Sequence, residues 1–175
     1  MKTALLVILF AAFSFAQEQE PASVSAAQSA CGPKETRFTV KSDTTQHALV
    51  QPEAGKALLF VVEDTSAATA IVEGPTVKIG LDGAWAGANQ RNSYFSIALD
   101  PGEHHLCANW QSRFDYLSRI VSLAHLTAEA GKVYYFPTRI VTAGHEIFLD
   151  LDPIDEDQGK LLIASSPLSL WIAKK

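Results

Sequence analysis

The chain has 175 residues, of which 14 are Lys or Arg and 19 are Asp or Glu, so its formal net charge at pH 7 is −5. It contains no basic block and no stripe of arginines with aromatics, which argues against nucleic acid as a partner. Hydrophobic residues make up 47% of the chain, as in a globular rather than a disordered protein.

The first residues have the pattern of a secretory signal peptide. Lys2 supplies a positive charge, residues 4–13 are apolar without interruption, and Ser14-Phe15-Ala16 is a small-x-small cleavage site. The apolar run is too short to span a bilayer comfortably, so we expect no transmembrane span in the mature chain. These features predict a signal peptide over residues 1–16 and an extracytoplasmic location, periplasmic or secreted, after its cleavage.

The next segment, residues 17–30, predicts a flexible leader. It consists largely of Gln, Glu, Ala and Ser, and it lacks the apolar periodicity that a packed element needs. Cys31 lies well beyond the apolar run, and the residues before it lack the aliphatic residue of a lipobox, so we do not expect it to carry a lipid. A single domain is therefore predicted over residues 31–175, a length that suits one hydrophobic core.

Short strands separated by turns follow Cys31. Most of them alternate between apolar and polar residues, whereas residues 56–63 are apolar on both faces, as in a central strand. The predicted strands cover residues 36–41, 56–63, 76–81, a return strand from 84, 93–99, 104–111, 132–141 and 145–151, with 124–128 leading into a turn. Asp82-Gly83 predicts a type I′ hairpin and Asp100-Pro101-Gly102-Glu103 a type II turn, so Gly83 and Gly102 should have positive φ.

The remaining segments are less regular. Residues 113–122 suit either a short helix or an exposed connection, and Pro137 indicates an edge or a bulge because proline cannot donate to a ladder. The acidic residues 155–157 predict the start of a short helix that runs to Ala164, and residues 167–175 form an apolar tail with a basic end. The succession of strands and tight turns predicts an all-β fold, an antiparallel β-sandwich with a short C-terminal helix.

The order of several short motifs resembles a known family. These motifs are Val77-Lys78-Ile79-Gly80-Leu81-Asp82-Gly83, Gly87, Ser93-Tyr94-Phe95, Asp100-Pro101-Gly102-Glu103-His104 and Ala130-Gly131-Lys132-Val133-Tyr134-Tyr135-Phe136. In this order they resemble domain of unknown function 2846, an uncharacterised bacterial envelope family, and more distantly PEGA-type modules. The resemblance spans roughly residues 55–165. It implies a transthyretin-like or prealbumin-like sandwich outside the cytoplasm and no known chemistry, and the lipobox cysteine of many relatives is missing here.

Two histidines and a cysteine occur close together in Glu103-His104-His105-Leu106-Cys107. Successive side chains of a strand point to opposite faces, so only His105 and Cys107 of this group could bind one ion together. Cys31 is the other cysteine of the chain, and two cysteines in an exported protein usually form a disulfide. We therefore predict a Cys31–Cys107 disulfide, no metal site and no cofactor.

The histidines leave an alternative open. His104 or His105 could form a metal site with His47, His125 or His145 across the sheet, in a metal-dependent or carboxylate-based hydrolase. Enzyme motifs elsewhere are incomplete: His145-Glu146 lacks the second histidine of the zinc-protease helix, and a Gly-x-Ser-x-Gly elbow does not occur. We therefore expect no enzymatic activity.

Aromatic and polar residues near the predicted hairpin suggest a binding surface instead. Trp85, Asn89, Arg91 and Asn92 would make a suitable surface for a glycan or a protein. In the alternative, Trp85 packs on the sheet and the loop is merely exposed. The sequence thus predicts a non-enzymatic binding or interaction module, whose partner would be an unknown envelope protein or glycan.

Overall fold

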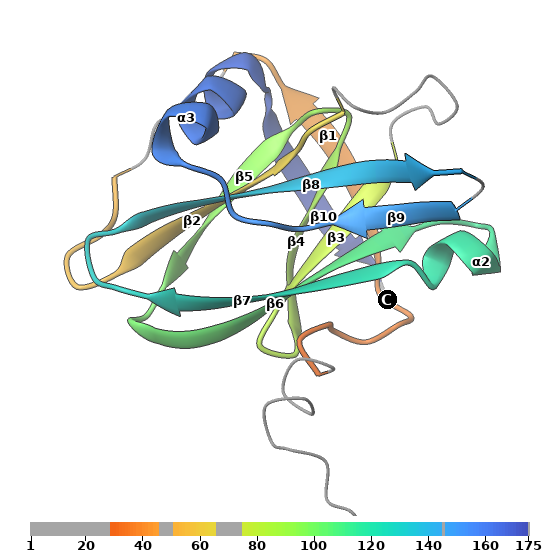
Figure 1. Cartoon of the computed structure of the whole chain (residues 1–175), viewed down its shortest axis with the longest axis horizontal. Helices are drawn as coiled ribbons and strands as arrows, with labels where there is room; N and C mark the ends of the chain where they lie inside the picture. Colours follow the sequence, from red (N-terminus) through yellow and green to blue (C-terminus); the bar gives the residue numbers. More distant parts are fainter. Residues whose placement is uncertain (1–28, 46–50, 66–74, 145, 175) are drawn as a thin grey trace, which may run out of the picture.

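The computed structural model describes residues 29–45, 51–65, 75–144 and 146–174. These residues form ten strands and two helices in the order that Figure 1 shows. The elements are β1 (Arg37–Asp43), β2 (Ala57–Glu63), β3 (Thr76–Leu81), β4 (Ala84–Gln90), β5 (Tyr94–Leu99), β6 (Gly102–Gln111), α2 (Asp115–Ser118), β7 (Val121–Ala128), β8 (Val133–Ala143), β9 (Glu146–Asp150), α3 (Glu156–Ser165) and β10 (Leu168–Lys174).

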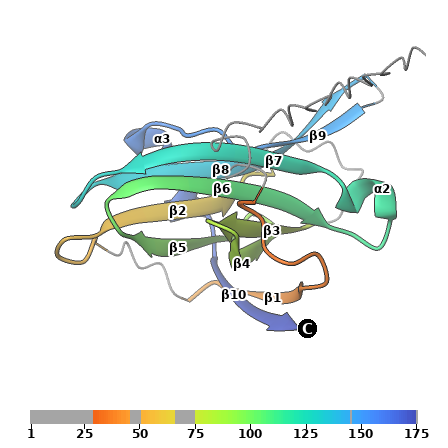
Figure 2. The same ribbon diagram turned by 90° about the horizontal axis from the view of Figure 1, so that it is seen from below.

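The strands form two sheets that pack against each other (Figures 1 and 2). The larger sheet has the order β1-β10-β5-β2-β8-β9 and the smaller one the order β4-β3-β6-β7. The predicted all-β sandwich is confirmed. The larger sheet is mixed, however, because β2 pairs in parallel with β8 and β10 joins β5 in parallel at the single pair Leu168–Tyr94.

Strand β2 is central, as its apolar sequence predicts, and all seven of its residues are buried. One of its faces, with Leu59 and Val61, lies in the core between the two sheets. The other face, with Leu58 and Phe60, lies in a second core that Ile163 of α3 covers. This double burial explains why β2 lacks the polar alternation of the other strands.

The positive φ angles predicted at Gly83 and Gly102 and the predicted C-terminal helix are confirmed. Asp82 and Gly83 have φ angles of +49° and +87°, and Gly102 has a φ of +137°. Helix α3 begins after Asp155, whose carboxylate accepts a hydrogen bond from the backbone N–H of Gln158 at 2.9 Å. The ambiguous segment after β6 contains α2, and β7 begins directly afterwards.

The tail at the end of the chain is the main departure from the sequence prediction. Residues 168–174 form β10, which pairs antiparallel with β1 over its whole length, from Arg37 opposite Lys174 to Asp43 opposite Leu168. A strand whose partner lies at the other end of the domain leaves no local signal beyond its apolar composition. The pairing therefore depends on tertiary contacts.

The predicted disulfide is confirmed, because the structure joins Cys31 to Cys107 with a Cα–Cα distance of 5.2 Å. It holds residues 29–36, which we call the N-terminal segment, on the outer face of the smaller sheet. A side chain at Gly80 would lie 2.6 Å from the Ala30 carbonyl oxygen, so the segment needs glycine beneath it. Ala30 is buried, and its carbonyl accepts a hydrogen bond from the backbone N–H of Gly83. The fold therefore begins before Cys31, and the predicted leader of residues 17–30 should end before Ala30.

The predicted signal peptide and residues 17–28 of the predicted leader lie outside the described residues. Among the residues that the structure describes, no helix has the length and hydropathy to cross a membrane.

Candidate functional site

Trp85, the aromatic residue of the predicted binding surface, packs on the N-terminal segment. Its indole N–H donates a hydrogen bond to the Pro33 carbonyl at 2.8 Å, and the Lys78 amine lies 4.1 Å from the centre of its ring. A side chain at Gly32 would collide with the same ring. Trp85 is therefore half-buried by contacts within the chain, as in the alternative in which it packs on the sheet.

The other predicted surface residues lie at the far end of β4. Asn89 is wholly buried and its side-chain amide donates to the Val61 carbonyl at 3.0 Å, so the prediction that Asn89 lies on a surface was wrong. Exposed Arg91 and half-buried Asn92 form the turn after β4 with φ angles of +56° and +60°. Roughly 20 Å of strand separate Trp85 from Arg91 in this turn, so the four residues do not share one surface. Binding by Arg91 and Asn92 stays a prediction.

His104 connects two turns of the sandwich. Its Nδ1 lies 2.6 Å from the Asp82 carboxylate and its Nε2 lies 2.8 Å from the Asp100 carbonyl oxygen. Both partners are acceptors, which suits a ring that carries protons on both nitrogens. Burial by itself lowers the pKa of His104, but the hydrogen bonds to Asp100 and Asp82 and their negative charges outweigh it, so the pKa is raised.

His105 points to the opposite face and lies beside His125, with 5.4 Å between the ring centroids. The structure thus brings together one of the histidine pairs that the sequence allowed, whereas His47 and His145 lie outside the described residues. Within the described part of the chain, no three His, Cys, Asp or Glu residues are arranged so that they could hold a metal ion. The metal-dependent alternative stays a prediction.

Glu63 is a buried acid that the sequence prediction missed. It lies at the end of β2, is 2% exposed, and neither carboxyl oxygen makes a hydrogen bond of normal geometry. Burial raises the pKa of Glu63 to about 8, although the nearby backbone N–H of Arg91 lowers it in part. Glu63 is therefore largely protonated at neutral pH. The available signal was an acidic residue at the end of a strand that is otherwise entirely apolar.

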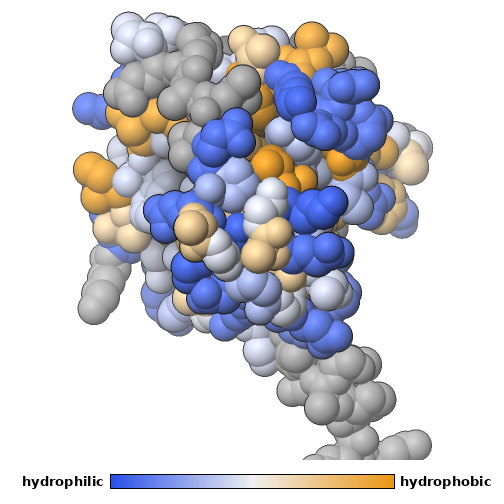
Figure 3. Space-filling view, turned by 90° about the vertical axis from the view of Figure 1, so that its left-hand side faces the viewer, coloured by the Kyte–Doolittle hydropathy of each residue, from blue (hydrophilic) through white to orange (hydrophobic). Residues whose placement is uncertain are grey.

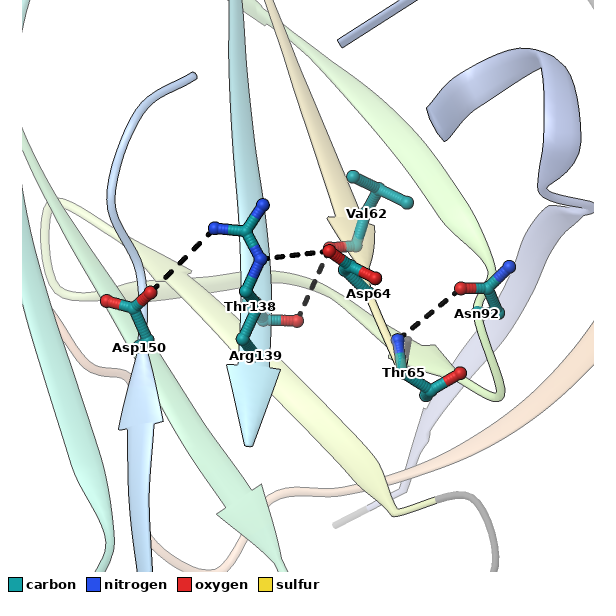
Figure 4. Close-up of polar contacts among 7 residues, drawn as sticks. All are labelled: Val62, Asp64, Thr65, Asn92, Thr138, Arg139 and Asp150. Atoms are coloured by element: carbon teal, nitrogen blue, oxygen red, sulfur yellow. Dashed lines mark hydrogen bonds and ion pairs between the residues drawn. The ribbon is translucent and has the colours of Figure 1, made fainter. Parts of the chain in front are cut away.

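The neighbouring acid, Asp64, points to the other face of the sheet and belongs to an ionic network (Figure 4). The Arg139 Nε atom lies 2.9 Å from an Asp64 carboxylate oxygen, and an Arg139 terminal nitrogen lies 3.9 Å from Asp150. Burial, followed by the charge of Asp152, raises the pKa of Asp150. Because Arg139 lies between two carboxylates, the network joins β8 electrostatically to the ends of β2 and β9.

Strands β1 and β10 form a further candidate, because most of their outward side chains are exposed. Their inward side chains are anchored: the rings of Phe38 and Trp171 are 5.5 Å apart, and the Ser169 hydroxyl donates to the Ala88 carbonyl at 2.7 Å. Alternation along a strand places the intervening residues on the opposite side. We call this side the β1–β10 face, and it comprises Arg37, Thr39, Lys41, Asp43, Leu168, Leu170, Ile172 and Lys174.

The β1–β10 face combines exposed aliphatic and basic side chains. Leu170 is 46% exposed and Ile172 is 68% exposed. The ladder places Lys41 opposite Leu170 and Thr39 opposite Ile172, with Arg37 and Lys174 paired at the end. Figure 2 shows β1 and β10 side by side at the edge of the molecule, outside β4 and β5.

The side of the molecule that carries α3 and several turns differs in character. Figure 3 shows mainly hydrophilic residues across the middle of this side, with hydrophobic residues in separate places. One of its ion pairs joins Lys56 to Asp100 at 2.6 Å. A second ion pair joins Lys160 to Glu156 of α3 at 2.6 Å, so both of these lysines are paired with acids.

Comparisons of the chain with protein-family models, with curated proteins and with solved structures gave no match. The resemblance to domain of unknown function 2846 and to PEGA-type modules therefore stays a hypothesis, carried by the motifs alone.

Proposed function

We propose that this protein is an extracytoplasmic, non-enzymatic binding module of the cell envelope and that it contacts its partner through the β1–β10 face. The observation that carries the proposal is the exposure of Leu170 and Ile172 among three basic side chains. Exposed apolar side chains that gather on one face commonly mark an interaction site. An envelope protein, a glycan or a lipid surface would each belong to this class of partner.

The structural roles of several reactive side chains support the non-enzymatic part of the proposal. Cys107 is in a disulfide, both nitrogens of His104 are hydrogen-bonded, and Arg139 lies between two carboxylates. Each of these groups joins segments of the fold to one another.

Two observations support the extracytoplasmic location. The sequence begins with the pattern of a secretory signal, and the disulfide is of a kind that persists in oxidising compartments. The resemblance to an envelope family agrees with both. The partner of the β1–β10 face is to be detected by contact in the cell.

Photo-crosslinking in the producing cell tests the proposed face. A photoreactive amino acid at Ile172 should give protein, glycan or lipid adducts that mass spectrometry detects, whereas the same amino acid at Leu161 should not. Leu161 is a matched control because it is 61% exposed and lies on α3, away from the β1–β10 face. Lys41→Glu should reduce the adducts at position 172. Equal adduct yields at both positions, or none at position 172, would contradict the proposal.

A further inference from the structure

We infer that the partner of the β1–β10 face is the surface of an anionic phospholipid membrane. This inference rests on the proposed function, because it names the partner of the same face. It is argued from the charge of the face, from its exposed aliphatic residues and from the way in which the two strands are held.

The charge of the β1–β10 face is opposite to that of the whole chain. The chain has a formal net charge of −5, yet the face carries three cations, Arg37, Lys41 and Lys174, and one acid, Asp43. Asp43 lies at the end of the ladder, opposite Leu168, and accepts hydrogen bonds from the backbone N–H and the hydroxyl of Thr45. A local positive charge on an acidic protein favours a negatively charged partner, and basic residues close to anionic lipid each strengthen membrane binding.

The aliphatic residues favour a lipid surface over a soluble anion. A free phosphate or an acidic peptide would be attracted by the cations but would leave Leu170 and Ile172 in water. At a membrane, these two side chains can enter the boundary between headgroups and acyl chains while the cations contact the phosphates. Lys and Arg have long apolar stems, which allow their charged ends to remain at headgroup level.

The geometry of the strand pair suits such contact. Lys41, Leu170, Ile172 and Lys174 project from the same side of one ladder, so they can reach a surface together. The inward contacts of Trp171 and Ser169 anchor the ladder to the rest of the sandwich, so the face is preformed. With two aliphatic residues and three cations, the expected binding is reversible and weakens as salt screens the charges.

Vesicle sedimentation of the exported, purified protein tests the inference. We expect binding to vesicles of phosphatidylcholine and phosphatidylglycerol in equal parts, little binding to phosphatidylcholine alone, and release at high salt. Leu170→Ser with Ile172→Ser should weaken the binding by about tenfold or more, because both side chains lose the apolar contact. Lys41→Glu should also weaken it.

Two variants serve as matched controls. Leu161→Ser changes an exposed aliphatic residue on α3, and Lys132→Glu changes an exposed lysine in the turn before β8. Both should bind anionic vesicles as strongly as the parent protein. Circular dichroism checks the folding of every variant, and Ile172→Ser alone replaces the double variant if that one fails to fold.

Several outcomes would overturn the inference. They are no binding to the anionic vesicles, equal binding to neutral vesicles, or binding that the face variants leave unchanged. A dimer in analytical ultracentrifugation that Ile172→Ser abolishes would identify the face as a self-interface instead. Protein adducts at position 172 in the cell without vesicle binding would retain the proposed function while refuting its lipid partner.

Discussion

Glu63 shows how one residue can couple the stability of this protein to pH. Its ordinary pKa is 4.5 and burial raises it to about 8, so between these values the folded state holds a proton that the unfolded state has released. The stability that Glu63 contributes is therefore fully present below its unfolded pKa of 4.5, and it decreases as the pH rises towards 8. Because an ionised carboxylate without partners is unfavourable in a protein interior, the folded state resists deprotonation.

We predict that Glu63→Gln removes most of this pH dependence. Glutamine has the shape of the protonated acid and does not ionise, so the variant should resemble the parent at pH 5 and exceed its stability at pH 8. A pKa shift of several units corresponds to on the order of a few kcal/mol in the free energy of unfolding at pH 8. Urea denaturation at a series of pH values measures the difference. Parallel pH curves for the two proteins would contradict the assignment.

The pH dependence of stability that His104 contributes has to be distinguished from that of Glu63. Its pKa is also raised, so it contributes stability that is complete below its unfolded pKa of 6.5 and is lost as pH rises through its folded pKa. The sign is the same as for Glu63, but the effect begins at a higher pH. The difference in the free energy of unfolding between Glu63→Gln and the parent therefore measures the effect of Glu63 alone. The pH dependence that remains in the variant above pH 6.5 includes the contribution of His104.

At the scale of the elements, two glycines hold the turns between strands. Gly83 closes the β3–β4 hairpin with a φ of +87°, and Gly102 begins β6 with a φ of +137°. Side chains with a Cβ rarely adopt such angles, and β-branched residues adopt them least. The two sites differ in space, because a Cβ at Gly83 would lie 3.0 Å from the Ser29 carbonyl oxygen whereas nothing lies within 4 Å at Gly102.

We predict that Gly83→Val and Gly102→Val each lower the free energy of unfolding by roughly 1 kcal/mol or more. Gly102→Val isolates the effect of the backbone conformation, because the site has open space around it. Gly83→Val should lower the free energy of unfolding further, because its side chain also contacts the Ser29 carbonyl oxygen. Thr127→Val, at an exposed strand position, is the control for valine itself. Thermal or urea denaturation compares the three variants. A parent-like Gly102→Val variant would show that positive φ is not required at this turn.

At the scale of the whole molecule, the disulfide holds the beginning of the domain on the smaller sheet. Cys31 and Cys107 are 76 residues apart, and a chain-entropy treatment of a loop of this length gives about 4.5 kcal/mol before strain. The bridge holds the N-terminal segment over Gly80 and close to Trp85, so its removal should loosen contacts across the outer face of this sheet.

We predict that alkylation of the exported, denatured and unreduced protein labels no thiol and that reduction releases both. Cys31→Ser with Cys107→Ser should lower the free energy of unfolding by about 2–4 kcal/mol, because the unfolded chain regains its freedom. Mass spectrometry after alkylation and urea denaturation provide the two readouts. Labelling of both cysteines without reductant would contradict the bridge and return Cys107 to the metal-binding alternative.

The sequence alone determined the features that depend on neighbouring residues. Alternating apolar residues predicted β3 and β5, Asp82-Gly83 predicted the hairpin, and Asp155 marked the start of α3. These follow from the twofold repeat of a strand and from turn and capping preferences that act over a few residues. The disulfide was also predictable, because two cysteines allow one intramolecular pairing.

Only the tertiary structure decided which distant segments meet. Asn89 was expected on a surface but is buried against β2, because sequence alternation does not reveal which residue the opposite sheet covers. The burial of Glu63 has the same origin. The β1–β10 face depends on a register that pairs Arg37 with Lys174. Contacts between chain ends are favourable only once the intervening domain has folded and brought them together, so no local pattern encodes them.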